Sequence, residues 1–222
     1  VVGLAKSKNG LVIESGELKL DEKDLISALN DLGATAAPDE VIKLPGTSTK
    51  LIAFTGLGQV QKKYDHETIR RASGAAARSL FGLKSATFAI ANDEHANAEG
   101  AALGSYLFTE FMNDKKPELK PPLSEIVVFG KGKVEKLSQA EIESKYVHLV
   151  RDLINTPPSH LNPETFCKAI IDAVKSAGGA SAGLKVSVLN DSQLKSKGYG
   201  GIIGVGQGSV NPPRLLNISY TP

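Results

Sequence analysis

The chain has 222 residues, of which 41% are hydrophobic and 23% are charged. These values lie near the averages of globular proteins and exclude a disordered tail or a coiled coil as the whole chain. With 26 basic and 24 acidic side chains, the formal net charge is only +2 and the lysines are scattered. This distribution is typical of a solvated surface and not of a basic stripe that binds nucleic acid.

Cysteine usage and hydropathy indicate the cellular setting. Cys167 is the only cysteine, so an internal disulfide is excluded and a reducing, cytoplasmic environment is favoured. No apolar run approaches the roughly 18 residues of a membrane span, and no secretory leader precedes the first strand pattern. We therefore expect a cytoplasmic protein without a membrane segment. Because Val1 already lies in a strand pattern, we expect a few preceding residues to be missing.

Residues 1–137 alternate between strand and helix patterns. Runs rich in apolar and β-branched residues predict strands at 1–6, 10–14, 41–44, 51–55, 85–91 and 126–129. Helical spacing of apolar residues predicts helices at 21–32, 65–81 and 96–112, with Asp65 as an N-cap and Gly33 after the first helix. Strands that alternate with helices favour a largely parallel sheet between two helix layers, with the last strand covered on both faces.

A long helix is expected to join this part to the rest of the chain. Ser138 and Glu141 have the spacing of a capping box, which predicts a helix start at Ser138. Pro157 and Pro158 disfavour helical geometry before them, so the helix is expected to end near Asn155. Between these limits an apolar stripe predicts one buried face, made of Ile142, Tyr146, Leu149, Val150, Leu153 and Ile154.

A second α/β segment is predicted after this helix. Asn162 as N-cap and Pro163 at the first helical position predict a helix that ends before Gly178. A strand pattern at 184–189 is followed by another capping-box spacing at 190–193, and the last strand pattern covers 214–220.

The glycine-rich run at 198–208 has two interpretations. Clustered backbone N–H groups can cradle a phosphate. However, the run lacks a Gly-Lys-Ser/Thr ending and the Gly-x-Gly-x-x-Gly spacing of nucleotide-binding loops. A tight passage from helix to strand, with glycines for close packing, is therefore favoured.

Few side chains of the sequence are candidates for catalysis or metal binding. The histidines are far apart and form no His-Glu-x-x-His pattern, so solvated or capping roles are favoured for His66, His95, His148 and His160. The acids Asp93, Glu94 and Glu99 follow a predicted strand and could be paired, but no metal ligand is near them in the sequence. Cys167 is expected to be a small buried hydrophobe and not a nucleophile. We predict no catalytic, cofactor-binding or metal-binding residue.

Three stretches carry a family resemblance. They are Glu-Gly-Ala-Ala-Leu-Gly-Ser-Tyr-Leu-Phe at 99–108, Val-Arg-Asp-Leu-Ile-Asn-Thr-Pro-Pro at 150–158, and Gly-Gly-Ile-Ile-Gly-Val-Gly-Gln-Gly-Ser at 200–209. Together and in this order they resemble the leucine aminopeptidase (cytosol aminopeptidase) family of dinuclear metallopeptidases. The order of elements upstream is similar to that of the family's N-terminal domain.

The resemblance implies a domain organisation. Residues 1–137 would form a three-layer αβα, macro-domain-like N-terminal domain, and residues 138–162 would form a connecting helix and a proline-rich linker. Residues 163–222 would form the incomplete start of an α/β catalytic domain.

The resemblance also implies which residues do the chemistry in the family. Its members bind two divalent ions, Zn²⁺ or Mn²⁺, through a lysine, three aspartates and a glutamate, aided by an arginine and a second lysine. In the family these residues lie first in a Gly-Lys-Gly segment that leads to Phe-Asp-x-Gly-Gly and later in Asn-Thr-Asp-Ala-Glu-Gly-Arg, and the 222 residues contain neither pattern. No functional residue is therefore carried over to this chain, and no cofactor is expected in it.

The implied function is that of the N-terminal part of a metal-dependent leucyl aminopeptidase, a hydrolase that removes N-terminal amino acids from peptides. The chain alone is expected to be inactive and to serve structural and assembly roles. The family is usually hexameric through its catalytic domain, so we expect this chain to be a monomer or weak oligomer with an exposed apolar edge at 215–220. The alternative is a binding module for an ADP-ribose-like ligand or DNA, and the scattered lysines argue against DNA.

Overall fold

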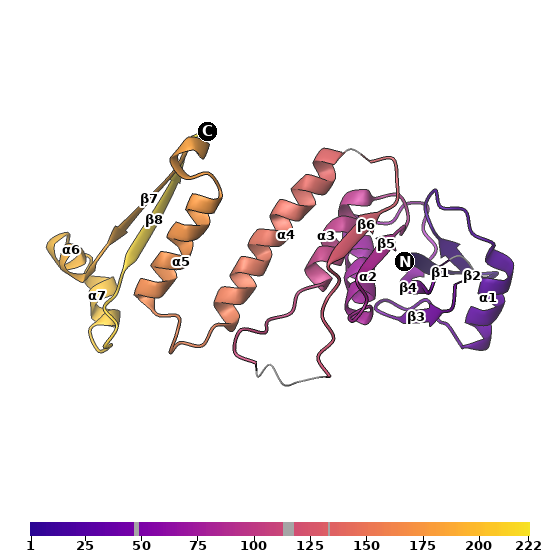
Figure 1. The fold of residues 1–222 in the computed structure, drawn as a ribbon. Coiled ribbons are helices and arrows are strands. Elements are labelled where there is room, and N and C mark those ends of the chain that lie inside the picture. The colour runs from indigo at the N-terminus through magenta and orange to yellow at the C-terminus, as the bar shows by residue number, and fades with distance from the viewer. Residues whose placement is uncertain (47–48, 113–117, 133) are drawn as a thin grey trace. The chain divides into compact units, whose positions relative to one another are not determined.

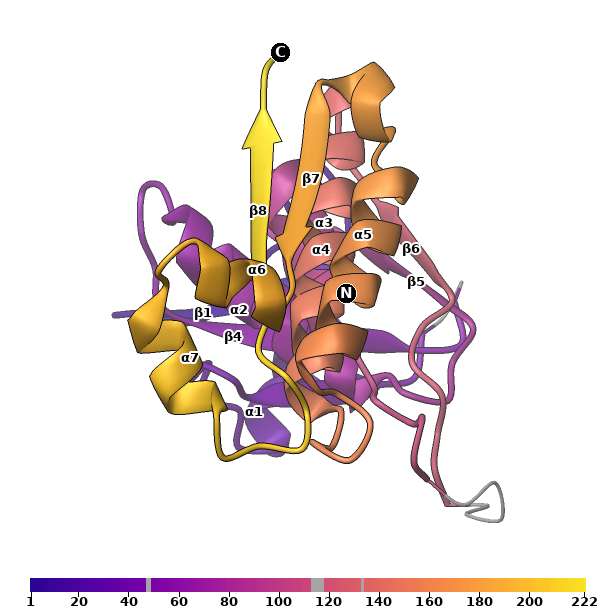
Figure 2. The ribbon, with the colours of Figure 1, turned by 90° about the vertical axis from the view of Figure 1, so that its left-hand side faces the viewer.

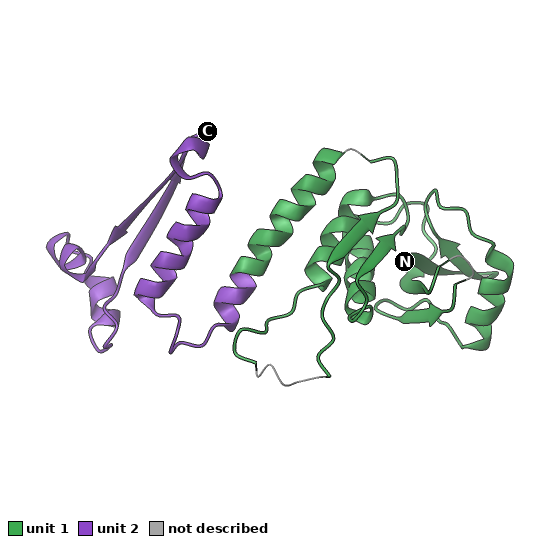
Figure 3. Ribbon diagram, in the orientation of Figure 1, with its two compact units in different colours: residues 1–149 green, residues 150–222 purple. Residues whose placement is uncertain are grey.

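The computed structural model describes residues 1–46, 49–112, 118–132 and 134–222. It contains two compact units, unit 1 at Val1–Leu149 and unit 2 at Val150–Pro222 (Figure 3). Each unit has its own strands and helices (Figure 1). Within the described ranges, every helix is too short or too polar to cross a membrane.

The strands of unit 1 run in both parallel and antiparallel directions. Those in the described ranges are β1 (Val2–Ser7), β2 (Gly10–Glu14), β3 (Val41–Leu44), β4 (Ile52–Gln59), β5 (Ser85–Phe88) and β6 (Glu125–Val128). The first four lie in the order β2-β1-β4-β3, in which β1 and β4 are parallel and the other neighbours are antiparallel. β5 and β6 form a parallel pair, and a bridge between Val2 and Ala89 lies beside it.

The prediction of a largely parallel sheet is therefore only partly correct. The connections from β1 to β2 and from β3 to β4 are too short for a crossover helix, so each pair forms a hairpin and reverses the strand direction. The last strand is also not covered on both faces, since Val127 in β6 is 42% exposed.

Two apolar clusters fill the two faces of the unit 1 sheet. Side chains alternate along a strand, so Leu4 belongs to one cluster and its neighbour Ala5 belongs to the other. The Leu4 cluster includes Leu29 of α1 (Glu22–Asp31). The Ala5 cluster includes Ile69 of α2 (His66–Ser79) and Ala101 of α3 (Glu94–Gly104). Helices thus cover both faces, which confirms the predicted three-layer αβα arrangement.

Several element ends in unit 1 differ from the prediction. Strand β5 ends at Phe88 and not at residue 91. The α3 helix ends at Gly104 and not at residue 112, because Ser105 caps it and donates its hydroxyl to the Ala101 carbonyl. Strand β4 continues through residues 56–58 to Gln59, because its pairing with β1 resumes after a bulge-like shift of register in which Gly58 adopts a left-handed φ of 79°.

The joining helix, α4 (Val134–Asn155), ends where the prolines predict but begins earlier than predicted. Ser138 lies inside the helix, so the predicted capping box is wrong, and the residue before α4 lies outside the described ranges. The predicted buried stripe is also wrong, because Ile142 is 57% exposed. The buried residues of α4 are Ala140 and Ser144, one turn apart on a different side of the helix.

Unit 2 combines one antiparallel strand pair with short helices. Its elements are α5 (Pro163–Ser176), the 3₁₀ helix Gly179–Ala182, β7 (Leu184–Leu189), α6 (Asp191–Ser196), α7 (Gly200–Gly206) and β8 (Leu215–Tyr220). The α5 helix lies against β7, as two views show (Figures 1 and 2). The capping boxes of Asn162 with Thr165 and of Asn190 with Gln193 are both formed, so the predicted helix starts are confirmed.

The glycine-rich run differs from its prediction. It forms the short helix α7 and not a tight passage from helix to strand. A β-carbon added at Gly200, Gly201 or Gly204 would meet open space, so close packing does not require these glycines. Only at Gly206 would the added atom meet a neighbour, Pro213, at 2.8 Å.

Candidate metal centre

The backbones of α2 and α3 are in direct contact, with no side chain between them at two glycines of α3. A β-carbon added at Gly100 would lie 2.1 Å from the Arg70 carbonyl oxygen, and one added at Gly104 would lie 2.4 Å from the Gly74 carbonyl oxygen. Only glycine permits such an approach. The two contacts lie about one turn apart in both helices, so the helices run in the same direction. The same register brings His66, one turn before Arg70, beside the first turn of α3.

Aspartates cap both helices at this end. The Asp65 carboxylate accepts a hydrogen bond from Thr68 N at 2.6 Å, and this bond lowers the pKa of Asp65. The Asp93 carboxylate accepts from Ala96 N through Oδ1 at 3.0 Å. Its second oxygen, Oδ2, is the one that contacts His66. The start of each helix is therefore fixed by a local bond, and Asp93 links the two.

His66 lies between two carboxylates. Its Nδ1 is 3.1 Å from Asp93 Oδ2 and its Nε2 is 3.0 Å from Glu99 Oε2. The hydrogen bond to Glu99 raises the pKa of His66, and the bond to Asp93 adds to this effect, whereas burial opposes it. The side chain is 45% exposed, so water weakens both ion pairs. The two carboxylates favour a positive charge at this position.

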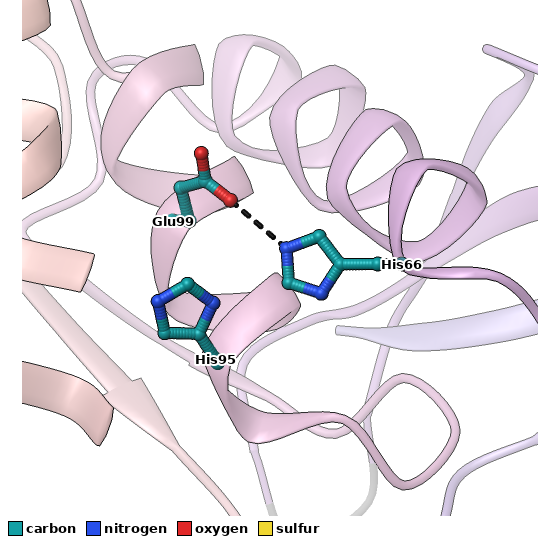
Figure 4. Close-up of side chains that lie close together, drawn as sticks. All are labelled: His66, His95 and Glu99. Atoms are coloured by element: carbon teal, nitrogen blue, oxygen red, sulfur yellow. Dashed lines mark hydrogen bonds and ion pairs between the residues drawn. The ribbon is translucent and has the colours of Figure 1, made fainter. Parts of the chain in front are cut away.

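His95 completes the cluster from α3 (Figure 4). Its ring centroid lies 5.2 Å from that of His66. Its Nε2 lies 3.3 Å from Glu143 Oε2 on α4, yet this buried nitrogen forms no hydrogen bond with any described group. One donor atom from each of His66, His95 and Glu99 lies within 4.8 Å of the other two. Two imidazoles and a carboxylate form a ligand set that Zn²⁺ accepts.

Sequence spacing does not predict this cluster. His66 and His95 are far apart along the chain, and the packing of α2 against α3 brings them together. The same packing places both Asp93 and Glu99 on His66, although no ligand is near these acids in the sequence. The available signal is the small-residue composition of the two helices, which predicts close helix packing but not its register.

The other two histidines have different neighbours. The His148 ring lies 5.2 Å from the Tyr106 ring, and His160 Nδ1 lies 3.0 Å from Ser159 Oγ. Neither residue belongs to the group that His66, His95 and Glu99 form among the described residues. Cys167 also matches its prediction, since it is 6% exposed and burial raises the pKa of its thiol, against the charge of Arg214. A protonated, buried thiol is a weak nucleophile.

A cleft of about 1090 Å³ lies next to the cluster and includes Asp93 in its lining. Its charged lining has both signs, with Lys19, Lys62, Lys63 and Lys136 beside Glu14, Glu17, Glu22, Asp93 and Glu94. Mixed charges produce no field that attracts a polyanion. The cleft therefore gives no specific support to a DNA-binding or ADP-ribose-binding role.

Two family models match the chain in order. Residues 1–115 match the N-terminal domain of the cytosol aminopeptidase family, and residues 148–222 match the catalytic domain of the same family. Probable cytosol aminopeptidases of Streptomyces griseus and Streptomyces avermitilis are 39% and 40% identical to the chain over its full length. The matches cover 48% and 47% of those proteins, so the chain spans about half the length of the curated relatives it matches.

Solved structures show the same fold at lower identity. The bottromycin maturation enzyme BotP in complex with Mn is 24% identical, with a TM-score of 0.74 over 93% of this chain and 44% of that one. A mutant of tomato leucine aminopeptidase is 19% identical, with a TM-score of 0.74 over 98% of this chain and 45% of that one. At these identities the likeness establishes the fold alone.

Proposed function

Because this chain belongs to the cytosol aminopeptidase family, we propose that it forms the N-terminal part of a metal-dependent aminopeptidase that removes N-terminal amino acids from peptides. In this proposal residues 1–137 are the N-terminal domain and residues 138–162 are the connecting segment. Residues 163–222 are the opening part of the catalytic domain. The observation that carries the proposal is the match of both family domains, in order, to one chain.

The residues of this chain do not fit the metal centre that the family uses. That centre combines a lysine, aspartates and a glutamate, and its sequence patterns are missing from the 222 residues. In the described ranges, the group with metal-ligating geometry is His66, His95 and Glu99, which has two imidazoles and neither a lysine nor an aspartate ligand. We therefore assign the peptidase metals, Zn²⁺ or Mn²⁺, to residues outside this chain, and we derive no catalytic step from it.

The chain itself then has a structural task. Unit 1 buries its own apolar core on both faces of a sheet and so supplies a folded domain. Peptide substrates, a homohexameric assembly and a cytoplasmic location belong to the proposal for the whole protein, and the relatives' name, cytosol aminopeptidase, supports the last of these. Light scattering of a protein with both complete domains checks the hexamer.

An activity comparison tests the proposal. We expect the 222 residues to release no p-nitroaniline from leucine-p-nitroanilide with Zn²⁺ or Mn²⁺ added. A protein that joins these residues to a complete catalytic domain should release it, and a chelator should abolish that release. Metal-dependent turnover by the 222 residues alone contradicts the assignment of the metals elsewhere. A complete protein that stays inactive with both metals contradicts the aminopeptidase proposal itself.

A further inference from the structure

We infer that His66, His95 and Glu99 form a Zn²⁺-binding site in unit 1, with Asp93 and Glu143 holding the two imidazoles in place. This inference goes beyond the proposed peptidase function and does not depend on it. His66 and His95 come from the first turns of α2 and α3, Glu99 comes from the second turn of α3, and Glu143 comes from α4. A bound ion would link the two helix starts at the end where their capping aspartates lie.

The spacing of the donor atoms suits a zinc ion. Zinc binds nitrogen and oxygen at about 2.0–2.2 Å in a tetrahedral arrangement, which places neighbouring ligand atoms roughly 3.3–3.5 Å apart. His66 Nε2 and Glu99 Oε2 are 3.0 Å apart, close to this spacing. All three donor atoms lie within 4.8 Å of one another. Side-chain rotations that move each donor atom by about 1 Å would therefore complete the geometry around an ion. Water would take the fourth position.

The second nitrogen of each imidazole ring lies close to a carboxylate. A zinc-bound histidine usually has a carboxylate or carbonyl on its second ring nitrogen, which fixes the ring and its tautomer. Here Asp93 Oδ2 lies 3.1 Å from His66 Nδ1, and Glu143 Oε2 lies 3.3 Å from His95 Nε2. This leaves His66 Nε2 and His95 Nδ1 for the ion. The His66 ring therefore has the hydrogen bond that supports metal-binding histidines, and the His95 ring has a carboxylate within reach of its second nitrogen.

The negative charge of the cluster favours a divalent cation. Three carboxylates, those of Asp93, Glu99 and Glu143, face two imidazoles. A divalent ion bound among them would neutralise two of these three negative charges. The buried Nε2 of His95, which forms no hydrogen bond with a described group, gains a defined role once Nδ1 binds the ion and Nε2 donates to Glu143.

Zinc binding to the 222-residue chain tests the inference. The chain is stripped with a chelator and titrated with Zn²⁺ against a chromophoric competitor at neutral pH. We expect one ion per chain, bound at micromolar affinity or tighter. The Glu99→Gln variant removes the ligand charge and keeps the side-chain size, and we expect at least a tenfold loss of affinity. Asn remains a good N-cap, so Asp93→Asn keeps the helix start and should cost about 10–100-fold.

A matched control separates this site from general histidine binding. His160→Gln removes an exposed histidine of unit 2, and its affinity for Zn²⁺ should equal that of the parent chain. Far-UV circular dichroism verifies that each variant is folded. Because Glu99→Gln changes a partly exposed surface group, it keeps the test valid even if a His95→Gln variant unfolds.

A spectroscopic readout reports the coordination directly. Co²⁺ in place of Zn²⁺ should give the intense visible absorption of a tetrahedral site, and Glu99→Gln should change it while His160→Gln should not. The inference is overturned if the chain binds no Zn²⁺ at micromolar concentration. It is equally overturned if Glu99→Gln and His160→Gln alter affinity to the same extent.

Discussion

Unit 1 and unit 2 are built from similar elements but differ in how much they bury. In unit 1, two apolar clusters occupy opposite faces of the sheet, and Phe54, Phe88 and Ile90 are at most 1% exposed. In unit 2, whose residues are all described, the buried apolar side chains are Cys167 and Leu194. This difference shows that capping boxes, a strand pair and one helix against it can define local structure with few buried side chains, whereas the larger core of unit 1 has helices on both faces of its sheet.

The largest effect is expected in the core of unit 1. Phe88→Ala removes a fully buried ring and should lower the free energy of unfolding of unit 1 by about 3–5 kcal/mol. The matched change in unit 2 is Phe166→Ala, at a ring that is 40% exposed, and it should cost about 1 kcal/mol. Guanidinium unfolding, with hydrogen exchange to assign the loss to a unit, measures both. Equal losses would show that unit 2 has a core comparable to that of unit 1.

Two glycine-to-alanine substitutions, one in a helix of each unit, compare how closely the helices of unit 1 and unit 2 are packed. The β-carbon of Gly100→Ala would lie 2.1 Å from the Arg70 carbonyl oxygen, so α2 and α3 must separate, at a cost of about 1–3 kcal/mol. Gly204→Ala in α7 meets open space and should stabilise unit 2 by up to about 1 kcal/mol, because alanine is the better helix former. Denaturant midpoints report both changes. Destabilisation by Gly204→Ala would mean that α7 is covered by a neighbour.

The smallest effect on the free energy of unfolding is expected from the Tyr64 hydroxyl, and it depends on pH in the alkaline range. Burial, followed by the negative charge of Glu14, raises the pKa of Tyr64 to about 12, and the two side chains are 3.2 Å apart. The folded state therefore holds this proton more tightly than the unfolded state, whose tyrosine has its usual pKa of about 10. The resulting stability is complete below pH 10 and is lost as the pH rises towards 12.

Substitution by phenylalanine tests this pH dependence. Tyr64→Phe should cost about 1 kcal/mol near neutral pH and should remove the extra loss of stability between pH 10 and 12. Tyr220→Phe in unit 2, where the ring is 64% exposed, is the control and should leave the curve unchanged. Urea unfolding at several pH values provides the measurement. An unchanged alkaline slope in Tyr64→Phe would assign the loss to other groups.

Local signals predicted much of the fold. The caps at Asp65, Asn162 and Asn190 depend on bonds within a few residues, and the structure forms all three. Non-local choices were harder to predict. Apolar spacing continues past Gly104 through Tyr106, so periodicity alone does not reveal where α3 ends. The direction of β2 depends on a short connection, which a general rule for alternating strands and helices does not consider.

The candidate metal centre is a clearer example of a feature that depends on non-local contacts and that the sequence therefore did not predict. Each of its residues can be seen in the sequence, and Asp93 and Glu99 can even be recognised as neighbouring acids. Their approach to His66 depends on the register of two helices, which is set by contacts at Gly100 and Gly104. Composition predicts that the helices pack closely, but it does not specify which turns meet.

The main-chain contacts between α2 and α3 fix the distance between the two helices independently of the functional side chains on them. Because carbonyl oxygens of one helix lie against glycines of the other, the distance between the helices depends on the backbone and not on the size of the side chains around it. Substitutions on the solvent side of either helix can therefore exchange one set of functional groups for another at a constant separation. Such a helix pair is a scaffold on which new binding specificities can arise without redesign of the core.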